Sequence, residues 1–404
     1  MSRDFAPRLT GETSPEFRLV CAALRWPRDA ARHAELATLV SGADFERVIA
    51  ITARHRVEGL VAHALLQCGA ELPAGGARHF AAVQHRTLRA NLLFASETVR
   101  LHRLCAAEDV DMLFFKGATL AQLVYGTLAH KMAMDIDLLV APADLPRVFA
   151  LLRREEYRIV IPMGASDEEL TRWIRVSHET TFRHNNHDAI VDVHGALVDN
   201  HRLLPGVGMT SPRQNVRIGG ADIPTLATPD LYAYLCAHGA MAGWTRLKWM
   251  ADVAALLAPL GPEGAADLHA HAEARGVGRC SAQVLMLASE MLGLALPPAL
   301  DARLWRSGVN RKLTQVGFEA MTGEFELRQP MIGTTDTVPV LLSQFRLRPG
   351  IGYFATELAR KLTNPVDRMK GVLPERLGFL YPLLSVSRWS TRQIARRLPG
   401  RARG

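Results

Sequence analysis

The first quarter of the chain has a helical pattern of hydrophobic positions. Apolar side chains recur at helical spacing through residues 45–66 and 77–107, and Asp44 precedes the first of these runs at an N-cap position. Residues 16–107 are therefore predicted to be helical throughout.

Short apolar segments then alternate with helical ones. The pattern predicts strands over residues 112–115, 134–140, 157–161, 178–183, 189–194, 215–218 and 222–226. Helices are predicted over residues 118–125, 142–155 and 167–176. Because some of these strands are joined by helices and others by short turns, we expect a small mixed sheet that ends near residue 226.

Helical spacing returns at Thr228-Pro229, a helix start with proline in the first turn. Helices are predicted over residues 231–241, 247–257, 264–275 and 279–292, and short amphipathic ones over 353–362 and 374–384. Residues 330–349 lack periodicity and are predicted to form a loop. The chain thus divides into an N-terminal helical region (1–107), an α/β core (108–226), a helical domain (227–329) and a C-terminal extension (330–404).

Two carboxylates stand out in the strand predicted over residues 134–140. Side chains alternate along a strand, so Asp135 and Asp137 project to one face while Ile136 and Leu138 project to the other. Two neighbouring carboxylates resist ionisation unless a cation lies between them. A hard divalent ion with oxygen ligands would explain the pairing.

An anion site is predicted directly upstream, at Lys116-Gly117. Gly117 lies where a strand passes into a helix, and a helix N-terminus presents free N–H groups to anions. Lys116 adds a positive charge. Together with Asp135 and Asp137, this turn describes a site for a metal-bound nucleoside triphosphate.

Residues 112–140 follow a fixed order: a strand, Lys116-Gly117, a helix, Tyr125-Gly126, Lys131 and the segment Asp-Ile-Asp-Leu-Leu-Val at 135–140. This order resembles the uncharacterised nucleotidyltransferase family of the polymerase-beta-like superfamily. The resemblance implies an α+β fold, a polymerase-beta-like nucleotidyltransferase core with a small mixed sheet, flanked by N-terminal and C-terminal helical regions. It also implies a third carboxylate on a later strand. Asp192 matches this position.

The expected roles follow from that resemblance. Asp135, Asp137 and Asp192 would bind Mg²⁺ or Mn²⁺ and act in catalysis, with Asp192 as general base. The triphosphate would be bound by Lys116, Gly117 and Lys131, with His194 lining the site beside Asp192. Residues 238–252 also match the family, and its candidate contacts to nucleotide or acceptor are His238, Lys248 and Asp252.

The histidines of the core suggest a zinc site only weakly. His178, His184, His187, His194 and His201 match no compact ligand spacing, and no cysteine joins them. We therefore expect no zinc site. The five cysteines are scattered, without Cys-x-x-Cys spacing, and are expected to be reduced and inert.

Composition changes this interpretation little. A chain of 404 residues with 48% hydrophobic residues can bury large cores. We find no transmembrane-length apolar run and no signal-peptide core, so a cytoplasmic location is expected. Of the net charge of +8, six charges come from arginines after residue 387, with no acid among them. This basic tail could make weak contacts with nucleic acid or an acidic partner, or could simply be solvated.

The sequence therefore predicts a metal-dependent nucleotidyltransferase that moves an NMP group from an NTP to an unidentified acceptor hydroxyl or phosphate. Two alternatives remain open. One is a non-catalytic module that keeps the fold and binds a nucleotide or peptide. The other is an RNA-modifying or toxin-like transferase that uses the basic tail. Neither the acceptor nor the preferred NTP can be inferred from the residues.

Overall fold

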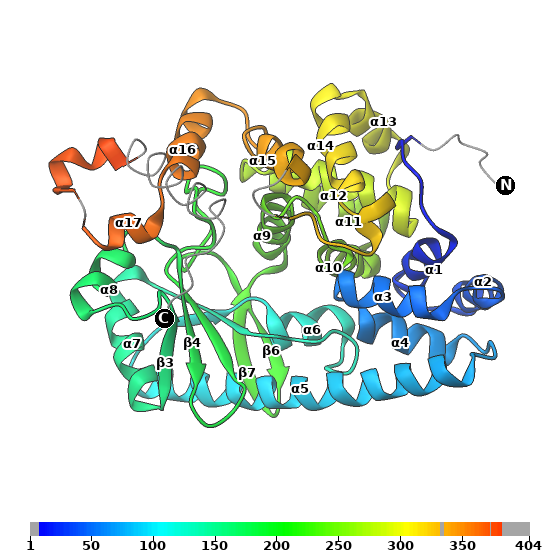
Figure 1. Cartoon of the computed structure of the whole chain (residues 1–404), viewed down its shortest axis with the longest axis horizontal. Helices are drawn as coiled ribbons and strands as arrows, with labels where there is room; N and C mark the ends of the chain where they lie inside the picture. The colour runs from blue at the N-terminus through cyan, green and yellow to red at the C-terminus, as the bar shows by residue number, and fades with distance from the viewer. Residues whose placement is uncertain (1–7, 332–334, 372, 382–404) are drawn as a thin grey trace, which may run out of the picture.

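The computed structural model describes residues 8–331, 335–371 and 373–381. Helices surround a five-stranded sheet and a two-stranded sheet (Figure 1). The expected α+β class, with a small mixed sheet between N-terminal and C-terminal helical regions, is confirmed.

The helices before the first strand are α1 (Pro15–Ala23), α2 (Ala30–Val40), α3 (Phe45–His55), α4 (Glu58–Gln67) and α5 (Ala74–Ala107). The single helix predicted over residues 45–66 is wrong, because α3 and α4 are separate. Arg56 has a left-handed φ of 55°, and its N–H donates to carbonyls at the end of α3. The apolar spacing continues across this break because both helices bury one face in the same core.

The α/β region begins with β1 (Met112–Phe114), α6 (Gly117–Tyr125), β2 (Ile136–Val140), α7 (Leu145–Arg154), β3 (Tyr157–Ile161), α8 (Asp167–Trp173), β4 (Glu179–His184) and β5 (Ile190–His194). The large sheet has the order β1-β2-β5-β4-β3. Its central strands β2 and β5 are parallel, whereas the other neighbours are antiparallel. A separate hairpin joins β6 (Arg213–Ile218) to β7 (Ala221–Leu226).

The large sheet lies between two hydrophobic cores. On one face, Ile136 and Leu138 of β2 pack with the second half of α5 and with α7 and α8. On the other face, Leu139 belongs to the core that the N-terminal helices share with the later helices. Asp137 projects to the same face as Leu139, since side chains alternate along β2. This carboxylate is therefore held between the sheet and the later helices.

The later helices are α9 (Thr228–Met241), α10 (Leu247–Leu257), α11 (Gly261–Ala274), α12 (Gly278–Leu292), α13 (Pro298–Arg306), α14 (Gly308–Glu319), α15 (Val338–Gln344), α16 (Ile351–Leu362) and α17 (Pro365–Met369). The loop predicted over residues 330–349 is wrong, because α15 lies within it. Pro339 occupies the first turn of α15, which is a favourable position for proline. Seven residues are too few to display a helical period in the sequence.

The boundaries of the four regions stay predictions. The basic tail falls outside the described residues. None of the described helices combines the length and the apolar character that crossing a membrane requires.

Candidate functional site

A cavity of about 300 Å³ lies above the carboxylate-bearing face of the sheet. Its walls come from the start of α4, the turn into α6, the loop before β2, and helices α9 and α10. The predicted site residues that line it are Lys116, Gly117, Lys131, Asp135, Asp137, Asp192, His238, Lys248 and Asp252. His194, the remaining one, lies behind the cavity wall in contact with Asp137.

Asp137 and Asp192 lie side by side because β2 and β5 run parallel with these two residues in register. Asp137 is 2% exposed, and its Oδ1 atom contacts the Lys116 ammonium and, at 3.2 Å, His194 Nε2. Asp137 Oδ2 and Asp192 Oδ1 are buried without a hydrogen-bond partner. Unpartnered buried carboxylate oxygens are costly, so these two atoms indicate room for a ligand that the chain itself does not supply.

The three aspartates differ in acidity. Burial would raise the pKa of Asp137, but Lys116 and His194 hold it well below its usual range. Burial raises the pKa of Asp192 to about 7, and the charges of Asp137 and Asp135 act in the same direction. A hydrogen bond with Thr181 partly opposes this rise. Burial and the charge of Asp137 also raise the pKa of Asp135. At neutral pH the site thus holds one firmly ionised carboxylate and one poised near its titration midpoint.

The turn at Lys116-Gly117 requires glycine. Gly117 has a φ of +58°, and a Cβ atom there would lie 2.7 Å from the carbonyl oxygen of Asp135. The first turn of α6 therefore packs directly against the segment that leads into β2. Lys116 precedes the helix and extends its side chain to Asp137, whose charge raises the pKa of Lys116 well above its usual value despite burial.

The loop before β2 is fixed by α5. The Asn91 side chain donates to the Lys131 carbonyl at 2.6 Å and accepts from the Ala133 N–H at 2.7 Å. The Lys131 ammonium then contacts Asp252 at 3.0 Å, and Asp252 also accepts a hydrogen bond from Tyr125 at 3.0 Å. Asp252 thereby positions Lys131 at the cavity wall.

Sequence reasoning missed two cations of the cavity, Arg56 and Arg246, and two acids, Glu58 and Glu179. Arg56 reaches the cavity from the break between α3 and α4, which the apolar pattern conceals. Within the described residues, neither Arg56 nor Lys248 forms an ion pair with a carboxylate. Burial and the charges of Lys131 and Arg56 lower the pKa of Lys248 to about 8. This side of the cavity is therefore suited to an anionic ligand.

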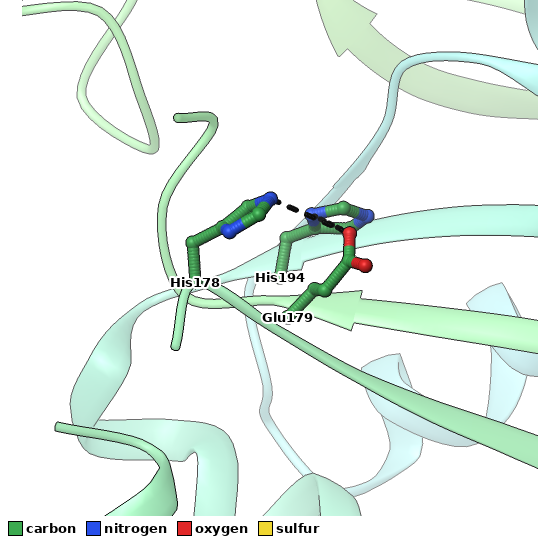
Figure 2. A group of neighbouring side chains, drawn as sticks. All are labelled: His178, Glu179 and His194. Atoms are coloured by element: carbon green, nitrogen blue, oxygen red, sulfur yellow. Dashed lines mark ion pairs between the residues drawn. The ribbon is translucent and has the colours of Figure 1, made fainter. Parts of the chain in front are cut away.

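Histidines predicted to form no metal site do gather with an acid. Among the described residues, one group of three potential metal ligands has its ligand atoms within 4.8 Å of one another, and it consists of His178, Glu179 and His194 (Figure 2). Asp135, Asp137 and Asp192 do not form such a group in the described part of the chain. Spacing along the chain gave no signal for this group, because it depends on the register that pairs Glu179 of β4 with His194 of β5.

A family model described as "Uncharacterised nucleotidyltransferase" matches residues 41–293. The match covers more than half of the chain and includes the sheet, the cavity and helices α9 to α12. The chain belongs to this uncharacterised nucleotidyltransferase family. No curated protein matches it. The family resemblance expected from residues 113–140 and Asp192 is thus confirmed, and the transferase class follows from membership in this nucleotidyltransferase family.

Proposed function

We propose that this member of the nucleotidyltransferase family transfers an NMP group from an NTP to an acceptor hydroxyl or phosphate, with release of pyrophosphate. The observation that carries the proposal is the pairing of Asp137 with Asp192 on parallel strands, each with a buried oxygen that lacks a partner. The family match supports the same reaction class.

The chemistry of the donor set suits a divalent metal, although the three carboxylates do not converge on one point in this structure and would have to move to share an ion. Asp135, Asp137 and Asp192 offer carboxylate oxygens only, which suits Mg²⁺ or Mn²⁺. The two unpartnered oxygens are the atoms such an ion would satisfy. When bound, the ion would neutralise phosphate charge and polarise the reacting phosphoryl oxygens.

Positively charged side chains along one side of the cavity could bind the phosphates of the donor nucleotide. Gly117, the first residue of α6, lines the cavity together with Lys131, Lys248 and Arg56. A helix N-terminus at this position would favour an anion. Lys116 is engaged by Asp137. We propose that Lys116 exchanges part of this contact for the triphosphate, because both partners of the pair lie in the cavity.

The acceptor is activated by Asp192. Without a metal, burial and the neighbouring carboxylates raise its pKa to about 7. A bound divalent ion would favour the ionised form, which accepts the proton of the attacking hydroxyl. His194 donates its Nε2 proton to Asp137 Oδ1 and keeps that carboxylate in place. His238 is half-buried in the cavity wall, and desolvation together with the charge of Lys116 holds its pKa well below the usual value. His238 is therefore neutral and offers a hydrogen bond to nucleotide or acceptor.

The test measures pyrophosphate release from each NTP with Mg²⁺ or Mn²⁺, in the presence of sugar, peptide, antibiotic and RNA acceptors. We expect Asp135→Ala and Asp192→Ala to lower release by at least about 100-fold, the lower end of general acid–base contributions. Asp188→Ala is the matched control, since Asp188 lies on the exposed hairpin between β4 and β5 and its side chain is 87% exposed.

Release that is absent, or equal in the wild type and Asp192→Ala, refutes the proposal. Nucleotide binding by equilibrium dialysis without release would favour the non-catalytic module. For the RNA-modifying alternative, RNA binding at two salt concentrations should depend on residues 388–404, since phosphate contacts weaken steeply with salt.

A further inference from the structure

Three potential ligand atoms converge beside the cavity, outside the set of aspartates. His178 Nε2 lies 3.4 Å from Glu179 Oε2, and His194 Nδ1 lies 3.8 Å from the same oxygen. Figure 2 shows the two imidazoles and the carboxylate directed toward one another. Ligands of a tetrahedral zinc ion lie about 3.3 Å apart, given metal–ligand bonds of about 2.0–2.1 Å. The observed spacing is thus already close to that of a bound ion.

The remaining ring nitrogens are held by carboxylates. His178 Nδ1 contacts Asp199, and His194 Nε2 contacts Asp137 at 3.2 Å. Histidine ligands of metals almost always have such a partner on the second nitrogen, which fixes the tautomer and aims the first nitrogen at the ion. Both histidines of this group therefore have the orientation of ligands.

His194 provides an independent observation. It is 2% exposed, and its Nδ1 atom is buried without a hydrogen-bond partner. A buried imidazole nitrogen left unsatisfied is unfavourable unless something accepts or coordinates it. The free nitrogen points at Glu179.

We infer that His178, Glu179 and His194 bind a transition-metal ion of the zinc class, separate from the Mg²⁺ or Mn²⁺ proposed at the aspartates. Two imidazoles and one carboxylate favour zinc or cobalt over magnesium, which prefers oxygen ligands. The side chains of His178 and Glu179 are 22% and 38% exposed, so water can fill the fourth position.

The ion would act on the neighbouring site through His194. With Nδ1 bound to the metal, the ring proton must reside on Nε2, which then donates to Asp137 Oδ1. The metal would therefore fix the orientation of Asp137.

The test uses the full-length protein, stripped of metal with a chelator and titrated with Co²⁺ and Zn²⁺ in excess Mg²⁺ without nucleotide. We expect one equivalent to bind, with the visible absorption of tetrahedral Co²⁺. His178→Ala should abolish binding, and Asp199→Asn should weaken it by about 10–100-fold, as is usual for partners of metal-bound histidines.

His187→Ala is the control, since His187 stacks on His184 at the hairpin turn and is not in the group. Binding should also survive in Asp192→Asn. Near-ultraviolet circular dichroism confirms that each variant is folded. No tight Co²⁺ binding by the wild type, equal binding by His178→Ala, or loss of binding in Asp192→Asn would overturn the inference. Because no step measures nucleotide transfer, these outcomes are independent of the proposed function.

Discussion

Replacing Asp192 by asparagine should stabilise the protein at alkaline pH while abolishing transfer. Asp192 shares its surroundings with Asp137 and Asp135, and its Oδ1 atom is buried without a partner. Asparagine has nearly the same shape and no charge. The substitution therefore removes the repulsion and the cost of burying an ionised group, while it also removes the proposed base.

The magnitude follows from the difference in acidity between the folded and unfolded chain. Asp192 titrates at about 7 in the folded chain, against 3.8 for the unperturbed side chain. Between these pH values the folded state retains a proton that the unfolded state has lost, so stability falls as pH rises through this window. The full penalty above pH 7 is at most about 4 kcal/mol, since each pH unit corresponds to ~1.4 kcal/mol. Because Asp192 is only partly buried, screening by solvent reduces our expectation to about 2 kcal/mol.

The assay is thermal unfolding of the wild type and Asp192→Asn at pH 5 and pH 8.5, in a chelator. We expect the variant to melt about 2 °C higher at pH 8.5, since an unfolding entropy of ~2.1 cal/mol/K per residue over 404 residues gives ~1.2 °C per kcal/mol. The gap should be less than half as large at pH 5, where the folded wild type is protonated but the unfolded chain is already largely ionised. Asp188→Asn, on the exposed hairpin, should show no such pH dependence. An advantage that is equal at both pH values, or a lower melting point at pH 8.5, would refute the reasoning.

Three further predictions concern the cavity. Lys116→Met should lower the free energy of unfolding by roughly 3 kcal/mol, because it removes the cation beside the buried Asp137 and leaves that carboxylate with only the hydrogen bond from His194. Urea unfolding in a chelator measures this, and stability equal to the wild type would contradict it. In the same assay, Gly117→Ala should lower the free energy of unfolding by more than Gly126→Ala. Both glycines have a left-handed backbone, which costs ~1–2 kcal/mol for alanine, but only at Gly117 would the added Cβ atom lie 2.7 Å from a carbonyl oxygen. Equal losses in the two variants would count against this contact. Lys248→Ala should raise the KM for NTP about tenfold with little change in kcat, as expected for a lost charged contact of ~1.5–3 kcal/mol. Steady-state kinetics measures both constants, and a fall in kcat with an unchanged KM would contradict the prediction.

The central strands could be predicted because their alternation is unambiguous. Asp137 and Asp192 each lie between apolar neighbours that belong in the core. A shift of the strand register by one residue would therefore place the carboxylate in the hydrophobic core and the apolar neighbours on the opposite face. The glycine at 117 was similarly informative, since its left-handed conformation and close approach to Asp135 tolerate no side chain.

Other features depend on contacts between distant segments. The ion pair of Lys116 with Asp137 forms because the turn before α6 folds back over β2, which no local pattern encodes. Arg56 enters the cavity through a break that the apolar period does not reveal. The gathering of His178 with His194 requires the register of β4 on β5, and the relevant spacing is across strands rather than along the chain.

Helix α5 limits how the molecule can move. Its 34 residues span about 51 Å at 1.5 Å per residue. Phe80 and Val83 of its first half belong to one hydrophobic core, and Phe94 and Leu101 of its second half belong to the other. A hinge between the two halves of the molecule would have to bend helix α5 near Asn91, the residue that holds the loop beside the cavity. Substrate entry should therefore not depend on a wide opening of two lobes.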